Sequence, residues 1–244
     1  MAMDESYLKS LAAFYECGNY REQFINALSK ISTNVKLGGV RSCLAIGPGD
    51  GWYELEFLKN CEANISKFIG IEPDHASAHH LRTSLRSSLL GVESQVFETN
   101  MQSWEGPGIP VDLIMMFQVL YFVPAGERQE FLNKVHANWL VSGGYVAVVT
   151  GTKSPGSPDV CEQLGSLTPR SEEIEADFLK AGFTIHCKHE MDVTRDLRDP
   201  DESLLPFYQL SIKDRLITLD DLCKAMKGTI FHVRRYTIVW TAVH

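Results

Sequence analysis

Short apolar runs alternate with longer amphipathic segments through the middle of the sequence. Consecutive apolar residues predict buried strands, and apolar residues recurring every three or four positions predict helices between them. The predicted strands are 42–46, 67–71, 94–98, 113–117 and 145–150. The predicted helices are about 53–60, 76–90 and 126–140. This order is typical of parallel β-α-β units, so we expect an α/β, doubly wound fold.

The two ends of the chain have patterns of their own. Two amphipathic helices are predicted before residue 40, and the apolar face of the second is Tyr20, Phe24, Leu28 and Ile31. A later helix over 171–181 precedes two alternating strands, 184–190 and 234–244, which we expect to pair antiparallel at one sheet edge. The acidic run 192–202 is predicted to be an exposed loop.

Repeats and low-complexity tracts are absent from the sequence, so we expect a single domain. Its predicted parts are a helical lid over 1–40, a ligand-binding core over 41–151, and covering segments with the closing strands over 152–244.

Charge and cysteine content narrow the class of protein. Lys and Arg total 23 against 31 Asp and Glu, a net charge of −8, which argues against nucleic acid or an anionic membrane as partner. The six cysteines form no C-x-x-C pair, so we expect neither a disulfide scaffold nor a metal site. The N-terminus lacks a basic and apolar leader, and no apolar run approaches the ~20 residues of a spanning helix. We expect a cytoplasmic protein with reduced thiols.

A glycine-rich turn follows the first predicted strand. Gly47, Gly49 and Gly51 alternate with Pro48 and Asp50 directly before a helix, where a ligand could approach the backbone closely. A tight turn without a ligand has the same pattern. Glu72, at the end of the next strand, favours a ligand, because a carboxylate there can accept hydrogen bonds from both hydroxyls of an adenosine ribose.

The charge of the turn bears on which nucleoside it binds. A dinucleotide would bring a pyrophosphate to the helix N-terminus, where Asp50 would repel it by ~1 kcal/mol per charge at ~4 Å even in water. S-adenosylmethionine, with a sulfonium, an α-ammonium and no phosphate, suits the turn better. NAD remains a competing interpretation.

The fourth predicted strand ends in a polar and aromatic stretch, Phe117 to Val123. Ligands of α/β sheets bind at the carboxyl ends of strands. An acceptor that reaches the donor's methyl group would therefore lie near Gln118, Tyr121 and Phe122.

These motifs together resemble a known family. The strings LAIGPGDGWYELEFL, IEPD and MFQVLYFV, preceded by GNYREQF, are similar to the class I S-adenosylmethionine-dependent methyltransferases, and within them to the histamine N-methyltransferases. The match runs from about Gly18 to Gly151. It implies a seven-stranded sheet with a reversed last strand.

The resemblance also implies site residues. Its cofactor-binding positions are Gly47, Pro48, Gly49, Asp50, Gly51, Glu72, Pro73, Thr99, Asn100, Phe117 and Gln118. Its aromatic acceptor positions are Tyr20, Phe24, Tyr121 and Phe122, to which we add Phe207 and His232 as candidates. Thr33 and Val233 replace polar contacts of the family, so a different amine or N-heterocycle is expected in place of histamine.

The sequence therefore predicts a monomeric methyltransferase acting on a small amine or N-heterocycle, by alignment of donor and acceptor rather than through a covalent intermediate. A non-catalytic nucleoside-binding module with the same fold is the alternative from another class. Transfer to oxygen or to a protein side chain is a further one.

Overall fold

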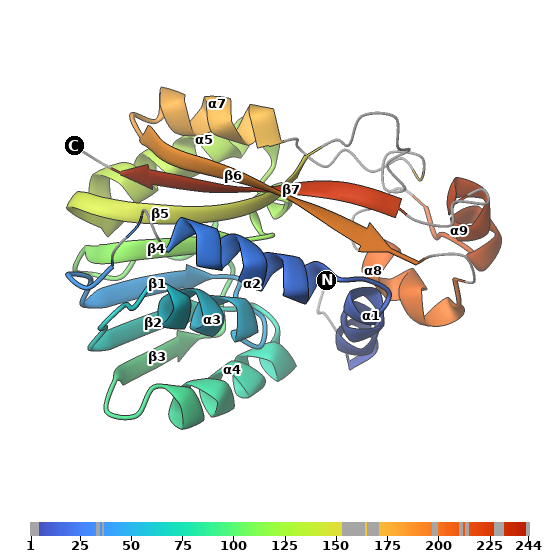
Figure 1. Ribbon diagram of the computed structural model, residues 1–244, viewed down its shortest axis with the longest axis horizontal. Helices are drawn as coiled ribbons and strands as arrows, with labels where there is room; N and C mark the ends of the chain where they lie inside the picture. Colours follow the sequence, from blue (N-terminus) through green and yellow to red (C-terminus); the bar gives the residue numbers. More distant parts are fainter. Residues whose placement is uncertain are drawn as a thin grey trace.

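A seven-stranded sheet lies at the centre of the computed structural model (Figure 1). The structure describes residues 5–32, 35, 37–152, 164, 171–196, 200–209, 212, 215–226 and 232–242, without the side chains of 5–8, 152, 195 and 232–242. The strands are β1 (Ser42–Ile46), β2 (Lys67–Ile71), β3 (Glu93–Phe97), β4 (Val111–Phe117), β5 (Leu140–Thr152), β6 (Thr184–Arg195) and β7 (His232–Ala242).

The strand order is β3-β2-β1-β4-β5-β7-β6. Strands β1 to β5 pair parallel to one another. Strand β7 runs antiparallel between β5 and β6. The predicted α/β, doubly wound fold is confirmed, as are the reversed last strand and the antiparallel pairing of the two late strands.

Helices cover both faces of the sheet. The helices are α1 (Glu5–Glu16), α2 (Tyr20–Ile31), α3 (Trp52–Asn60), α4 (His75–Ser88), α5 (Ala125–Lys134), α7 (Ser171–Lys180), α8 (Leu205–Gln209) and α9 (Leu219–Met226). The hydrophobic cores follow from the alternation of side chains along each strand. Cys43 and Ala45 of β1 pack in one core with α2, α3 and α4, whereas Leu44 and Ile46 pack in another with α5 and α7.

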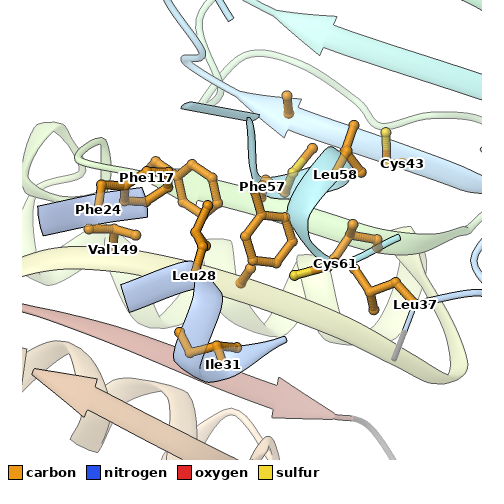
Figure 2. Packing of buried hydrophobic residues seen from close by; sticks show 14 of the residues in the cluster. Phe24, Leu28, Ile31, Leu37, Cys43, Phe57, Leu58, Cys61, Phe117 and Val149 are labelled. Carbon is orange, nitrogen blue, oxygen red and sulfur yellow. The ribbon is translucent and has the colours of Figure 1, made fainter. Parts of the chain in front are cut away.

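Helix α2 is part of the first core. Its side chains Phe24, Leu28 and Ile31 are buried and point toward the sheet beside Phe57 and Phe117 (Figure 2). Helix α2 also contacts strand β6 and helix α3. The helix thus covers the sheet directly, with the apolar face that its sequence predicts.

A third, smaller cluster joins the N-terminal helix to the C-terminal part of the chain. Helix α1 contacts α8 and the 3-10 turn Glu202–Leu204, and its Phe14 packs with residues of α8 and α9. Among the described cysteines, five are free thiols. None of the helices in the described part of the chain is long and apolar enough to cross a membrane.

Several element boundaries differ from the sequence prediction. The helix predicted over 126–140 ends at Lys134 and continues as a π-helical turn, Val135–Trp139. Strand β6 runs to Arg195, so the run 192–202 is not simply a loop; Val193, inside it, is fully buried. The last strand begins at His232 rather than residue 234. The charged residues at the start of the run 192–202 do not have the pattern of a strand. They are in strand β6 because they pair with β7, and this pairing overrides their local preference.

The burial of α2 gives a stability prediction. Leu28 is fully buried, so Leu28→Ala should lower the free energy of unfolding by about 2–5 kcal/mol. Asn26→Ala, on the exposed side of the same helix, serves as the control and should change it by less than about 0.5 kcal/mol. Urea unfolding monitored by circular dichroism measures both. Equal losses in the two variants would contradict the packing of α2 on the sheet.

Candidate functional site

The ends of two neighbouring strands meet at the glycine-rich turn. Strands β1 and β2 are parallel and in register, with Ile46 opposite Ile71, so the residues that follow them emerge at the same sheet edge. The Gly47 N–H donates to the Ile71 carbonyl at 2.8 Å. This bond holds the start of the turn against the end of β2.

The Glu72 carboxylate connects the turn to the next helix. The Gly49 N–H donates to Glu72 Oε2 at 2.9 Å, and the Asp74 N–H donates to Glu72 Oε1 at 3.0 Å. Asp74 in turn caps α4, where its Oδ2 accepts the Ser77 N–H at 2.8 Å. Glu72 is only 3% exposed, so it is a buried acid fixed by backbone amides.

The three glycines of the turn have different surroundings. All three have positive φ, a conformation that favours glycine. A Cβ on Gly47 would lie 2.7 Å from Val119 Cγ2, and one on Gly51 would lie 2.5 Å from Leu81 Cδ1. A Cβ on Gly49 would meet no atom within 4 Å. A side chain at Gly47 or Gly51 would therefore have to displace Val119 or Leu81, whereas Gly49 leaves open space beside its backbone.

Acidic side chains gather around this turn. Burial raises the pKa of Glu72, and the amides of Asp74 and Gly49 partly oppose that rise. Asp50 Oδ1 accepts the Trp52 N–H at the start of α3. Glu54, in the first turn of α3, is 1% exposed, and burial raises its pKa well above the ordinary carboxyl value. The sequence from Cys43 to Leu58 contains no Lys, Arg or His.

Gln118 follows β4, on the other side of β1 from Glu72. Its φ is +56°, a left-handed conformation that is uncommon outside glycine and is found at functional sites. Its N–H donates to the Val149 carbonyl at 2.8 Å, and its side-chain amide lies 3.4 Å from the Tyr20 hydroxyl. The preceding Phe117 ring packs on Phe24. Gln118 thus links the end of β4 to helix α2.

Five rings form an aromatic cluster between α1, α2 and α3: Tyr15, Tyr20, Phe24, Trp52 and Tyr53. Tyr53 contacts all the others, with ring centroids 4.7 to 5.5 Å apart. The Arg21 guanidinium lies 4.9 Å from the Trp52 ring centroid. The predicted residues Tyr20 and Phe24 are thereby brought together beside the turn. Trp52 and Tyr53 were not predicted, although their place directly after Gly51 was the available signal.

The other predicted site residues lie in separate places. Tyr121 and Phe122 form a ring pair, 4.5 Å between centroids, in the 3-10 turn after β4. The Phe122 carbonyl accepts the side-chain amide of Gln102 at 3.2 Å. Phe207 stacks on Phe14 at 3.7 Å, in the third cluster. Thr33 lies outside the described residues, and so do the side chains of His232 and Val233.

The loop after β3 reaches the same sheet edge. The Glu72 N–H donates to the Phe97 carbonyl at 3.0 Å, which places the end of β3 beside the end of β2 and the adjoining Pro73. Beyond it, Asn100 Oδ1 accepts the Ser103 N–H at 2.8 Å, and Thr99 Oγ1 lies 3.4 Å from Ser103 Oγ. Thr99 and Asn100 therefore belong to one hydrogen-bonded turn.

Comparisons with known proteins give a consistent fold. No family model matches the sequence, and no curated protein matches it. A putative methyltransferase from Bacillus halodurans is 12% identical, with a TM-score of 0.62 over 88% of this chain and 98% of that one. A geranyl diphosphate C-methyltransferase from Streptomyces coelicolor A3(2), solved with Mg²⁺, geranyl diphosphate and S-adenosylhomocysteine, is 16% identical, with a TM-score of 0.57 over 90% and 80%.

A protein of another activity is similar as well. The 4+2 cyclase SpnF is 17% identical, with a TM-score of 0.58 over 89% of this chain and 80% of that one. At such identities the likeness establishes architecture alone. The chain has the α/β Rossmann-like fold of the class I S-adenosylmethionine-dependent methyltransferases.

Proposed function

We propose that this protein is an S-adenosylmethionine-dependent methyltransferase that transfers a methyl group to a nitrogen of a small amine or N-heterocycle. The observation that carries the proposal is the hydrogen bond between the Gly49 amide and the buried Glu72 carboxylate. It fixes a carboxylate beside an open glycine backbone at the carboxyl ends of two adjacent parallel strands, where α/β folds bind nucleosides.

The residues present fit the methyl donor. Each Glu72 oxygen accepts one backbone N–H, which leaves lone pairs for the two ribose hydroxyls. The open side of Gly49 would receive the methionine part, and the turn of Thr99 and Asn100 would lie toward the adenine. Asp50 in the turn, with Glu54 and Glu72 outside it and no basic residue between 43 and 58, suits a cationic ligand better than a pyrophosphate.

The chain's own residues would act by placement. When bound, S-adenosylmethionine supplies an electrophilic methyl group on a positively charged sulfur. Holding the acceptor in line with it can supply roughly 7–11 kcal/mol of the barrier. Gln118 is fixed in its left-handed conformation, close to the Tyr20 hydroxyl, and would lie between the donor and the acceptor.

The aromatic cluster supports nitrogen as the acceptor atom. An amine becomes cationic as it is methylated, and each well-placed aromatic face stabilises such a cation by about 0.5–2 kcal/mol. Tyr20, Tyr53 and Trp52 lie together next to the turn. Tyr121 and Phe122, after the same strand as Gln118, would complete the acceptor side.

The experiments must distinguish methyl transfer to nitrogen from two alternatives. The neighbours include a C-methyltransferase and a cyclase, so carbon or oxygen acceptors and a non-methylating role share this fold. A nucleoside-binding module without catalysis would bind the donor but would not turn over any acceptor.

Gly49→Val tests the open side of the turn. The added side chain would fill the space for the methionine part, so we expect the affinity for S-adenosylhomocysteine to fall about 100-fold, equivalent to about 2.7 kcal/mol. Gly91→Val is the matched control, because Gly91 also has positive φ and open space but lies before β3. Calorimetric titration, with NAD as a second ligand, measures binding. Similar affinities in both variants would refute the placement of the donor at Gly49.

Glu72→Ala tests the ribose assignment. Loss of a charged acceptor should weaken S-adenosylhomocysteine binding by about 1.5–3 kcal/mol. Because the variant also frees the Gly49 and Asp74 amides, affinity alone does not isolate the ribose contact. The sharper readout is the preference for S-adenosylhomocysteine over its 2′-deoxy analogue. That preference should disappear in the variant; its persistence would show that Glu72 does not bind the ribose.

The acceptor atom requires a turnover screen. Amines, N-heterocycles, phenols and carbon acids are incubated with the protein and radiolabelled S-adenosylmethionine, and labelled products are counted. We expect transfer to at least one nitrogen compound. Transfer to oxygen or carbon alone would correct the acceptor, and donor binding without any turnover would favour the non-catalytic module.

A further inference from the structure

The Glu54 carboxyl is buried without the partners that usually accompany a buried acid. Glu54 lies in the first turn of α3, three residues after Gly51, and is 1% exposed. Its Oε2 atom is buried and has no hydrogen-bond partner among the described residues. An unpaired polar atom in the interior costs about 1–3 kcal/mol, so a carboxyl kept there calls for a reason beyond packing.

The charged neighbours of Glu54 are negative. Burial is the largest cause that raises the pKa of Glu54, and the charges of Asp50 and Glu72 raise it further. The Glu54 backbone N–H, by contrast, lowers that pKa. Glu54 in turn raises the pKa of Cys43 in β1, after the larger effect of burial on that thiol.

The two basic residues of the neighbouring helix α2 act on other groups. Lys30 lies near His189, whose pKa it lowers after the larger effect of burial. The Arg21 guanidinium lies over the Trp52 ring and partly opposes the rise in the pKa of Tyr53 that burial causes. Among the described residues, the charged groups that act on the Glu54 carboxyl are the acids Asp50 and Glu72. Burial, the unpartnered Oε2 and the two neighbouring acids therefore all favour the neutral, protonated form of the Glu54 carboxyl in the free protein.

We propose that Glu54 is the counter-charge for the cationic methionine end of the methyl donor, and that it takes this role by releasing its proton when the donor binds. The inference rests on the proposed function. The O–H bond of the carboxyl breaks, its electron pair stays on oxygen, and the proton passes to the solvent. The positive charge of a donor bound near the turn would lie close to Glu54 and favour its ionised, carboxylate form.

The position of Glu54 makes this role specific. Asp50 Oδ1 is already used by the Trp52 N–H, and both Glu72 oxygens accept backbone amides. Glu54 Oε2, in the first turn of α3, is buried and has no hydrogen-bond partner among the described residues, whereas Asp50 is exposed to water. Glu54 is also shielded from water, so its charge is screened less than that of a surface acid.

The role implies a dependence of donor affinity on pH. Because binding releases a proton, the association constant for S-adenosylmethionine should rise with pH below the raised pKa of free Glu54, with a slope of up to about one per pH unit. Above that pKa the carboxyl is already ionised, so the slope should disappear.

Folding stability should depend on pH in the opposite direction. A carboxyl with a raised folded-state pKa contributes its full stability below the pKa of the unfolded chain and loses it as pH rises toward the folded-state value. Glu54→Gln should therefore gain stability relative to the unliganded wild type as pH rises from about 5, above the pKa of a glutamate in the unfolded chain. Thermal unfolding across this range also establishes that the variant folds.

Calorimetric titration of S-adenosylmethionine and S-adenosylhomocysteine in buffers of different ionisation enthalpy tests the proposal. For the wild type we expect release of up to about one proton with S-adenosylmethionine. Glu54→Gln should abolish that release and weaken S-adenosylmethionine about tenfold. Glu56→Gln, on the same helix and paired with Lys59, is the matched control and should behave as the wild type.

The outcomes separate the two claims. Loss of affinity in Glu54→Gln for S-adenosylmethionine alone identifies the sulfonium as the partner, and equal loss for both ligands identifies the α-ammonium; either supports the counter-charge. Wild-type binding without proton release, together with unchanged affinities in Glu54→Gln, overturns the role of Glu54 and leaves the proposed function standing. Failure of both ligands to bind the wild type overturns the proposed function itself.

Discussion

The contact between the Gly49 amide and the Glu72 carboxylate joins three parts of the fold at one point. It connects the turn after β1 to the end of β2, and Glu72 continues the connection to Asp74 at the start of α4. The neighbouring bond from Gly47 to Ile71 fixes the same two strands. Because Glu72 is buried, these bonds form away from competing water, and the shape of the turn depends on them.

The same contact lies among acids that have no basic residue in the surrounding stretch 43–58 of the sequence. Asp50, Glu54 and Glu72 gather where the sequence supplies no basic residue, and the pKa of both Glu54 and Glu72 is raised by burial. Such an arrangement costs folding free energy. A ligand that carries positive charge would recover part of that cost on binding, which relates the stability of the turn to its chemistry.

The sequence predicted the parallel core well because β1, β2, β4 and β5 are rich in consecutive apolar residues; β3, with the sequence ESQVF, is the exception. Strands β1 and β2 were predicted with the observed bounds, and Gly47–Gly51 and Glu72 were predicted at one edge because parallel strands end there. Long-range pairing was harder. Strand β6 extends into the acidic run 192–202. The first residues of that run are in the strand because they pair with β7, which is distant in sequence.

The aromatic side of the site was predicted only in part for a similar reason. Tyr20 and Phe24 were predicted as acceptor positions from the family resemblance, but the ring at the centre of the cluster is Tyr53, whose neighbours come from α1, α2 and α3. The burial of Glu54 likewise depends on packing that periodicity does not report. Phe207, by contrast, stacks on Phe14 in the third cluster.

The most direct test of the central claim is a crystal structure of the protein grown with S-adenosylhomocysteine. The account predicts the ribose hydroxyls within hydrogen-bonding distance of the Glu72 oxygens and the homocysteine part against the open side of Gly49. A nucleoside bound at another place, or a turn filled by the protein's own side chains, would contradict it.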